Sequence, residues 1–178
     1  MKPFPAFGLV ILALSMSIPV PGICGGKVTT PEEVFSNPES LARGLYAAVT
    51  IEPGKPPDWG YVRKFFLPEA VIGVRKTRTT MEVMDVEAFV KWFEDDVKRL
   101  KMEERGFEES VQKLKLTVFG DIAQCFVVYK ARLKTPAESP GQLGLDSFAL
   151  MKKDGRWWVV SIVNDIVTPE RPLPEELK

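Results

Sequence analysis

The part of the chain after Gly106 constrains the fold most, because it consists almost entirely of strand-forming sequence. Between Val111 and Phe119, apolar and polar side chains alternate with the two-residue period of a half-buried strand. Asp154-Gly155 is a strong signal for a two-residue hairpin turn. Strands are predicted over residues 111–119, 122–133, 145–153 and 157–167. This order predicts a long antiparallel meander.

Helical signals dominate the sequence before Gly106. The clearest helix is predicted from Asp85 to about Arg105, with Asp85 as its N-cap. Its apolar residues share one helical face: Val86, Phe89, Val90, Phe93, Val97 and Leu100. Asn37-Pro38-Glu39 starts an earlier helix, and Asp58 can cap a short one that ends near Phe66. Helices followed by an antiparallel meander predict an α+β fold.

The last predicted hairpin is apolar on both faces. One face carries Trp158, Val160 and Ile162, and the other carries Trp157, Val159 and Val163. Antiparallel sheets usually leave one face to water, so the helices are expected to cover one face and something else part of the second. A homodimer that buries sheet against sheet is the simplest explanation.

The first 26 residues have the composition of a secretory signal peptide. Lys2 is followed by an apolar run from Phe7 to Val20 and a small-residue exit at Gly25-Gly26. The run is too short for a membrane span, which needs about 20 residues. A lipid anchor at Cys24 is disfavoured because Ile23, and not a small residue, precedes it. We therefore expect a signal peptide over residues 1–26, one domain over residues 27–178, and an exported protein that is periplasmic or secreted.

Composition excludes several classes of chemistry. The chain contains no histidine, which removes Ser-His-Asp and Cys-His nucleophiles and every histidine-ligated metal site. No phosphate-binding or metal-binding motif takes their place, so we expect neither a cofactor nor a metal. Without residues 1–26 the chain has one more acidic than basic residue, which argues against nucleic acid or an anionic membrane as a partner. Cys125 among apolar neighbours predicts a buried thiol.

Several segments, in their order and spacing, resemble the nuclear transport factor 2-like superfamily, which includes ketosteroid isomerases and SnoaL-like cyclases. The segments are residues 61–71 (YVRKFFLPEAV), 120–123 (GDIA), 153–160 (KDGRWWVV) and the tail 168–174 (TPERPLP). The tail is similar to that of exported bacterial members without an assigned function. The resemblance implies a strongly curved antiparallel sheet wrapped in a cone around three N-terminal helices, with a pocket between them, often in a dimer. It does not imply one chemistry, since members of one fold differ widely in function.

Candidate acid/base residues follow from the register of the last hairpin. A two-residue turn at Asp154-Gly155 places Asp146, Ser161 and Asp165 on one sheet face, away from the turn. Inside a pocket, burial and mutual repulsion would raise a carboxyl pKa and leave one aspartate protonated for acid/base work. The plainer interpretation, which we prefer, is that both aspartates are ordinary surface carboxylates.

Aromatic residues with polar tips are the other pocket candidates. They are Tyr46, Trp59, Tyr61, Trp92 and Tyr129, which core packing would also explain. Arg75, Lys76 and Arg78 form a small basic patch that could meet an anionic ligand, although a charged run of this size is more often solvated surface, which is the interpretation we prefer.

Three functions remain open at this point. The preferred one is an exported protein that binds a small apolar or amphipathic ligand and has no recognisable catalytic set. The alternatives are a cofactor-free acid/base isomerase or cyclase using Asp146 and Asp165, and a dimeric protein-interaction module. The sequence does not decide whether the protein is an enzyme.

Overall fold

A computed structural model describes residues 31–137 and 140–178 of the chain. Its helices are α1 (Pro31–Val34), α2 (Pro38–Val49), α3 (Trp59–Arg63), α4 (Val86–Arg99), α5 (Met102–Arg105) and the 3-10 helix η1 (Glu175–Leu177). Its strands are β1 (Phe66–Arg75), β2 (Met81–Met84), β3 (Phe107–Phe119), β4 (Ile122–Leu133), β5 (Gln142–Lys153) and β6 (Arg156–Ile166). The expected signal peptide over residues 1–26 lies outside the described residues. Within the described ranges, no helix has the length and apolar character needed to cross a bilayer.

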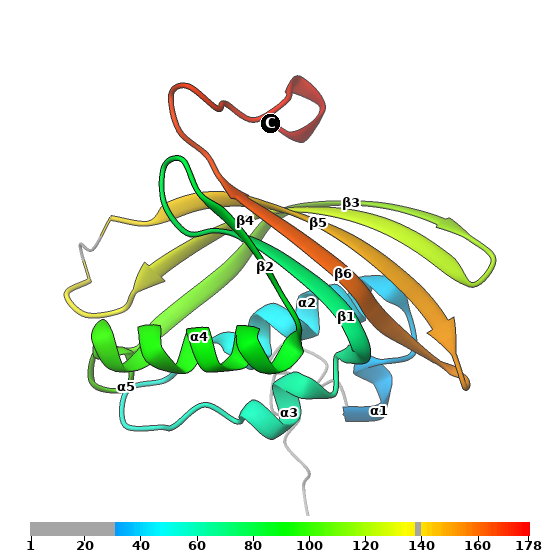
Figure 1. Cartoon of the computed structure of the whole chain (residues 1–178), viewed down its shortest axis with the longest axis horizontal. Coiled ribbons are helices and arrows are strands. Elements are labelled where there is room, and N and C mark those ends of the chain that lie inside the picture. The colour runs from blue at the N-terminus through cyan, green and yellow to red at the C-terminus, as the bar shows by residue number, and fades with distance from the viewer. Residues whose placement is uncertain (1–30, 138–139) are drawn as a thin grey trace, which may run out of the picture.

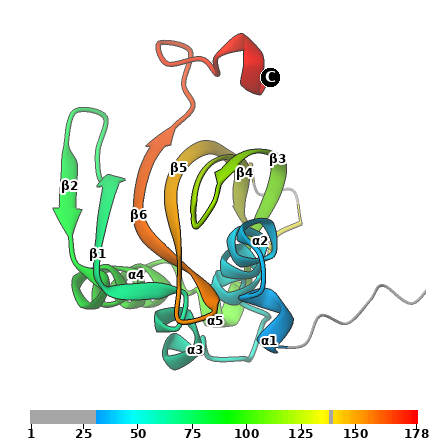
Figure 2. The same cartoon turned by 90° about the vertical axis from the view of Figure 1, so that its right-hand side faces the viewer.

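The strands form one six-stranded sheet in the order β2-β1-β6-β5-β4-β3. Neighbouring strands are antiparallel except for β1 and β6, which pair in parallel. The chain crosses from β2 at one edge of the sheet to β3 at the other edge and returns strand by strand to β6 beside β1. Figures 1 and 2 show the sheet curling into an open cone, with the helices on its concave side. The predicted α+β fold with a curved sheet around N-terminal helices is confirmed.

Local sequence signals fix the helix ends. Asn37, Asp58 and Asp85 each accept a hydrogen bond from a backbone N–H three residues ahead, at 2.8 Å in every case. Helix α4 ends at Arg99, earlier than predicted, because Lys101 adopts a left-handed conformation with φ 53°. The chain then makes the short helix α5 and turns into β3 at Gly106, where φ is 70°.

The core lies between the concave face of the sheet and the helices. Helix α2 contributes Leu41, Leu45 and Val49, and α4 contributes Val90 and Val97. Cys125 is completely buried, as predicted, and burial raises the pKa of its thiol to about 12. Most of this interior is packed, but an unfilled space remains where the cone widens between α2 and α4.

The predicted register of the last hairpin is correct near its turn and wrong beyond it. Leu150 pairs with Val159, as a two-residue turn requires, but Ala149 pairs with Ser161, so Val160 is the extra residue of a β-bulge. Beyond the bulge, Asp146 faces Asn164, and Asp165 pairs with Leu145. Because side chains alternate faces along a strand, this shift of one residue moves Asp165 away from the face that carries Asp146.

The C-terminal tail lies on the convex side of the sheet (Figures 1 and 2). It buries Leu177, and its last carbonyl accepts a hydrogen bond from Lys113 Nζ on β3 at 2.5 Å. The tail therefore covers part of the second apolar face, for which the sequence had suggested a partner subunit. Apolar residues remain exposed elsewhere on β1–β4 and β6: Val71, Met81, Val83, Val118, Phe119, Ile122 and Val163.

Candidate functional site

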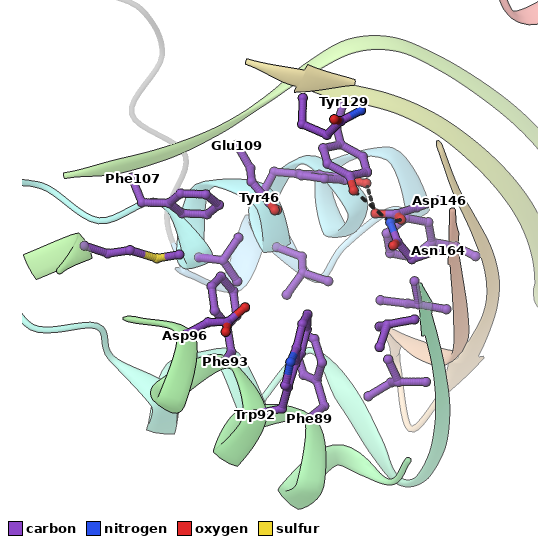
Figure 3. Close-up of a pocket in the computed structure, with 18 of the residues that line it drawn as sticks. Tyr46, Phe89, Trp92, Phe93, Asp96, Phe107, Glu109, Tyr129, Asp146 and Asn164 are labelled. Atoms are coloured by element: carbon purple, nitrogen blue, oxygen red, sulfur yellow. Dashed lines mark hydrogen bonds between the residues drawn. The ribbon is translucent and has the colours of Figure 1, made fainter. Parts of the chain in front are cut away.

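The unfilled space is a cavity of about 390 Å³ inside the cone. Helix α4 supplies Phe89, Trp92 and Phe93 to one wall, and α2 and the concave sheet face supply the other (Figure 3). The wall is mainly aromatic and aliphatic, with a few polar side chains gathered where β4, β5 and β6 meet α2. This size and lining are typical of sites for small organic ligands, which occupy roughly 300–1,000 Å³.

Asp146 is the centre of the polar corner of the cavity. Tyr46 Oη, from α2, donates a hydrogen bond to Asp146 Oδ2 at 2.5 Å. Asn164 Nδ2, from the neighbouring β6, donates to Asp146 Oδ1 at 2.7 Å and to Tyr129 Oη at 2.8 Å. Asp146 and Tyr129 are 8% and 7% exposed. The corner is therefore a connected network in which one buried carboxylate accepts from two donors.

Burial raises the pKa of the Asp146 carboxyl to about 6, although the hydrogen bonds from Tyr46 and Asn164 act in the opposite direction. Burial and the Asp146 charge together hold the pKa of Tyr46 well above its usual value. The pKa of Tyr129 is raised by the same two causes. At neutral pH the network therefore contains an ionised aspartate and two neutral tyrosines.

Tyr129 has a hydroxyl proton that no group within residues 31–137 and 140–178 accepts. Its oxygen takes the hydrogen bond from Asn164, so the proton remains free to be donated into the cavity. A polar group of a ligand could accept it, since a buried donor is costly to leave unpaired.

Gly144 makes room for the Tyr129 ring. The two residues face each other on β5 and β4, and a Cβ atom at Gly144 would lie 2.2 Å from the Tyr129 Cζ and Oη atoms. Only glycine lets the ring lie across the neighbouring strand, which places its hydroxyl beside Asn164.

Glu109 adds a second carboxyl group to the cavity wall. It comes from β3, where Phe107 and Glu109 face inward and Glu108 faces outward to Arg132. Burial, with a smaller contribution from the charge of Asp146, raises the pKa of Glu109 to about 8. Its side chain is half-buried and lines the cavity.

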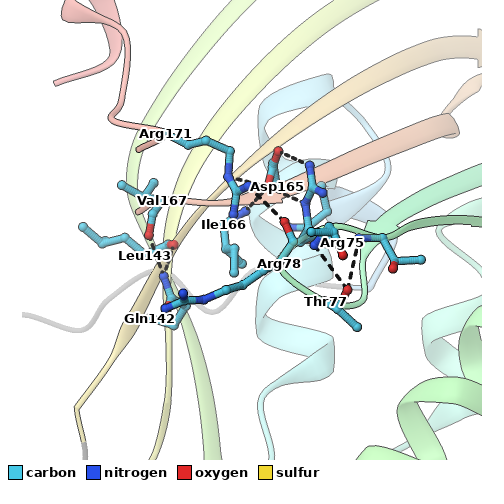
Figure 4. A network of polar contacts seen from close by, with 12 residues as sticks. Arg75, Thr77, Arg78, Gln142, Leu143, Asp165, Ile166, Val167 and Arg171 are labelled. Carbon is cyan, nitrogen blue, oxygen red and sulfur yellow. Dashed lines mark hydrogen bonds and ion pairs between the residues drawn. The ribbon is translucent and has the colours of Figure 1, made fainter. Parts of the chain in front are cut away.

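Asp165, the second predicted acid/base residue, is not part of the cavity. Its carboxylate takes two hydrogen bonds from Arg75, at 3.0 and 2.9 Å, and an ion pair from Arg171 at 3.6 Å (Figure 4). The Arg75 guanidinium lowers the pKa of Asp165 below its usual value. The predicted pairing of Asp146 with Asp165 is therefore wrong, because the bulge at Val160 turns the two side chains to opposite faces.

Two of the three side chains in the predicted basic patch have acidic partners within the chain. Arg75 binds Asp165, and Lys76 forms an ion pair with Glu82 at 3.0 Å. The carbonyl of Arg78 accepts a hydrogen bond from Arg171 of the tail (Figure 4). The patch thus holds the β1–β2 turn and the tail together and gives no support to an anion site.

The remaining candidates divide between the cavity and other places. Tyr46, Trp92 and Tyr129 lie on the cavity wall. Trp59 packs against Phe93 and Tyr61 against Phe65, both outside the lining. Ser161 pairs with Ala149 and Val71 on the convex side, because it follows the bulge.

Sequence reasoning missed Asn164, Glu109 and Asp96, which also line the cavity. The alternation that carries Phe107 into the core could have located Glu109, because the two residues are two apart on one strand. Asn164 could not be located, because its face depends on the bulge.

The cavity can hold an amphipathic molecule and offer it one or two carboxylates and a tyrosine hydroxyl. An aspartate with a pKa near 6 can also act as a general base, provided that a substrate proton comes within hydrogen-bonding distance. Within the described residues, no group of three or more cysteine, aspartate or glutamate side chains is placed to hold a metal ion.

Comparison with solved structures places this fold among known ones. A protein from Xanthomonas campestris, described as a putative calcium/calmodulin-dependent protein kinase II association domain, matches at a TM-score of 0.55 and 16% identity, over 74% of this chain and 86% of that one. A nuclear transport factor 2-like protein of Novosphingobium aromaticivorans matches at 0.57 and 13% identity, over 75% and 85%. A putative ketosteroid isomerase from Shewanella frigidimarina matches at 0.51 and 18% identity, over 78% and 98%. At these identities the likeness establishes the fold alone.

Sequence comparison adds the family. No curated protein gave a significant match. Residues 57–164, more than half of the chain, match the family described as putative lumazine-binding. That range includes α4, the whole of β1 to β5 and most of β6. The chain belongs to this putative lumazine-binding family, and its fold is the one seen in nuclear transport factor 2-like proteins.

Proposed function

We propose that this protein binds a small amphipathic molecule in the cavity between α2, α4 and the concave face of the sheet. The observation that carries the proposal is the cavity of about 390 Å³, apolar over most of its wall, with a polar network at one end. The apolar body of the ligand would lie against Phe89 and Trp92, and its polar end would meet Tyr129 and Asp146. The family description, which names lumazine binding, supports a ligand-binding role.

The test uses a neutral fluorescent probe, phenylnaphthylamine, whose emission rises in apolar surroundings. The wild-type protein is expected to bind it, and Val74→Trp, which fills the cavity from β1, is expected to abolish binding. Val71→Trp is the matched control, because Val71 lies on the same strand but is 50% exposed, whereas Val74 is 4% exposed. Equal binding by both variants would contradict the proposal. Native mass spectrometry of protein from its own source would then identify a co-purifying ligand.

A cofactor-free acid/base enzyme, isomerase- or cyclase-like, is the second candidate. Asp146 favours it, since a buried carboxylate with a raised pKa beside tyrosine hydroxyls suits proton abstraction. Asp165 has no role in this version. Incubation with a ketosteroid that carries a non-conjugated double bond, followed by absorbance of the conjugated product, tests it. Turnover that is lost in Asp146→Asn would support it, and no turnover above the buffer rate would remove this substrate class.

Two further properties belong to the proposal. The protein acts outside the cytoplasm after cleavage near residue 26, which fractionation and N-terminal sequencing of the mature protein would check.

It also forms a homodimer through the exposed apolar residues of the convex face, among them Val163 at 52% exposed. The likeness to an association domain supports this assembly. Light scattering should give twice the monomer mass, and Val163→Glu should halve it; a monomeric wild type would contradict the dimer.

A further inference from the structure

The charged side chains on the cavity wall are all acidic. Asp96, Glu109 and Asp146 line it, and within the described residues no lysine or arginine does. Asp96 already binds Arg99, at 2.7 Å, so its charge is largely compensated. The remaining electrostatic character of the cavity comes from Glu109 and Asp146.

Glu109 is the carboxyl group without a partner. Within residues 31–137 and 140–178 it has neither a hydrogen bond nor an ion pair from its side chain, whereas Glu108 beside it binds Arg132 at 2.9 Å. A partly buried carboxyl left unpaired in an apolar wall is costly unless it is protonated or meets a cation. Within the described residues no lysine or arginine lies on the cavity wall, so a cation for Glu109 has to come from a ligand.

The aromatic wall favours the same kind of ligand. Ring faces are negative and attract ammonium groups, and the effect strengthens where water is excluded. The cavity presents seven aromatic side chains: Tyr46, Phe89, Trp92, Phe93, Phe107, Tyr129 and Phe148. Trp92 already has a cation near it, since Lys76 Nζ lies 5.2 Å from its ring centroid, but Lys76 is neutralised by Glu82 and does not line the cavity.

We propose that the ligand is an organic cation: an amine that carries at least one N–H on its ammonium group and an apolar or aromatic body. The ammonium group would bind between Glu109 and Asp146, and the body would lie against the rings of α4. This inference rests on the proposed function, because it names the chemical class of the ligand for the same cavity.

Binding of such a ligand should be coupled to proton release. In the empty cavity Glu109 holds its proton at neutral pH, because its pKa is about 8. The ionisable groups that share the cavity wall with Glu109 are Asp146 from β5, Tyr129 from β4, Tyr46 from α2 and Asp96 from α4, and none of them is a cation. An ammonium group stabilises the ionised form and expels the proton, so affinity should rise as pH increases from 6 to 8.

The decisive experiment compares three ligands that differ only in their polar end: phenylpropylammonium, phenylpropanol and phenylpropanoate. Each displaces phenylnaphthylamine from the wild-type protein, which gives its Kd. We expect the ammonium to bind about tenfold or more tightly than the alcohol, and the carboxylate to bind least. A trimethylammonium analogue should lose part of this gain in affinity over the alcohol, since it has no N–H to donate.

The matched variants are Glu109→Gln and Glu108→Gln, which remove neighbouring carboxylates from the inner and outer faces of β3. Glu109→Gln should reduce the preference for the ammonium over the alcohol to about threefold or less, whereas Glu108→Gln should keep it. Calorimetry in two buffers of different ionisation enthalpy should detect proton release in the wild type and none in Glu109→Gln. If Glu109→Gln fails to fold, the relative Kd values of the three ligands for the wild-type protein still test the inference.

The outcomes separate this inference from the proposed function. If the dye binds but the alcohol displaces it as well as the ammonium does, the cation inference is wrong and the binding function stands. If Glu109→Gln keeps the full ammonium preference, Glu109 is not the recognition group and the inference is overturned. If the dye does not bind the wild type, both proposals fail together.

Discussion

Asp146 and Asp165 lie on neighbouring strands at the same end of the sheet, and their surroundings are opposite. Asp146 points into the cone, accepts hydrogen bonds from neutral donors and has a raised pKa. Asp165 lies on the convex side, binds two arginines and has a lowered pKa. A shift of one residue in register therefore decides whether a carboxylate points into the cavity or binds arginines on the convex side, one of them from the tail.

The two aspartates should also change stability with pH in opposite directions. The raised pKa of Asp146 means that its ionisation opposes folding, so its contribution falls as pH rises from about 4 to about 6. The lowered pKa of Asp165 means that its ionised form favours folding, so its contribution is lost as pH falls below the ordinary aspartate range.

The largest effect on stability is expected from Gly144→Ala, which would disrupt the packing of Tyr129 on the concave side of the sheet. The new methyl group would overlap the Tyr129 ring and push its hydroxyl away from Asn164. We expect a loss of about 3 kcal/mol in the free energy of unfolding, measured by urea denaturation. Gly73→Ala is the control, because its Cβ would meet nothing closer than 3.7 Å. An equal loss in both variants would contradict the account of Tyr129.

Asp146→Ala should come next. It leaves the Tyr46 hydroxyl and one Asn164 donor without an acceptor, at a net cost of about 2 kcal/mol in the free energy of unfolding at pH 7. Part of the cost is offset, because the buried charge is removed as well. A neutral or stabilising result would mean that water satisfies these donors as well as Asp146 does.

The stability of Glu109→Gln relative to the wild type should depend on pH. Removing the carboxyl stabilises the protein relative to the wild type as pH rises from about 4.5 to about 8, and the difference should level off above that. Because the Glu109 side chain is only partly buried, we expect a gain of about 1 kcal/mol. Melting temperatures of both proteins from pH 5 to pH 9 measure it. A difference that stays constant across this range would contradict the burial of Glu109.

Asp165→Asn should have the smallest effect, about 0.5 to 1 kcal/mol at pH 7, because the ion pair with Arg75 is partly exposed to solvent. The cost should shrink in high salt and disappear below the pKa of Asp165. A loss as large as that of Asp146→Ala would remove the distinction between the two faces.

The fold was predictable because its signals are local. The alternation in residues 111–119, the turn at Asp154-Gly155 and the caps at Asn37, Asp58 and Asp85 each act within a few residues. The strand β2 was not predicted, because its four residues pair with β1 without a strong pattern of their own.

The site was predictable only in part. Tyr46, Trp92 and Tyr129 could be suggested as lining because large amphipathic side chains often border cavities. Asp146 was identified, but we preferred a solvent-exposed surface for it, and the structure shows that this preference was wrong. The donors that make its burial tolerable come from α2 and from β6, far away in sequence, and no local pattern reveals that they converge.

The bulge at Val160 reverses the alternation of inward and outward side chains along β6. Because the bulge absorbs the one extra residue, deletion of Val160 would leave every pair beyond it unchanged, and Asn164 would still face Asp146. Asp165 would reach that face only if β6 kept all of its residues and lost the bulge, and Arg75 would then lose its partner. A register slip of one residue that straightened β6 would therefore exchange an amide for a further acid on the cavity face and release the tail from Asp165 in the same step.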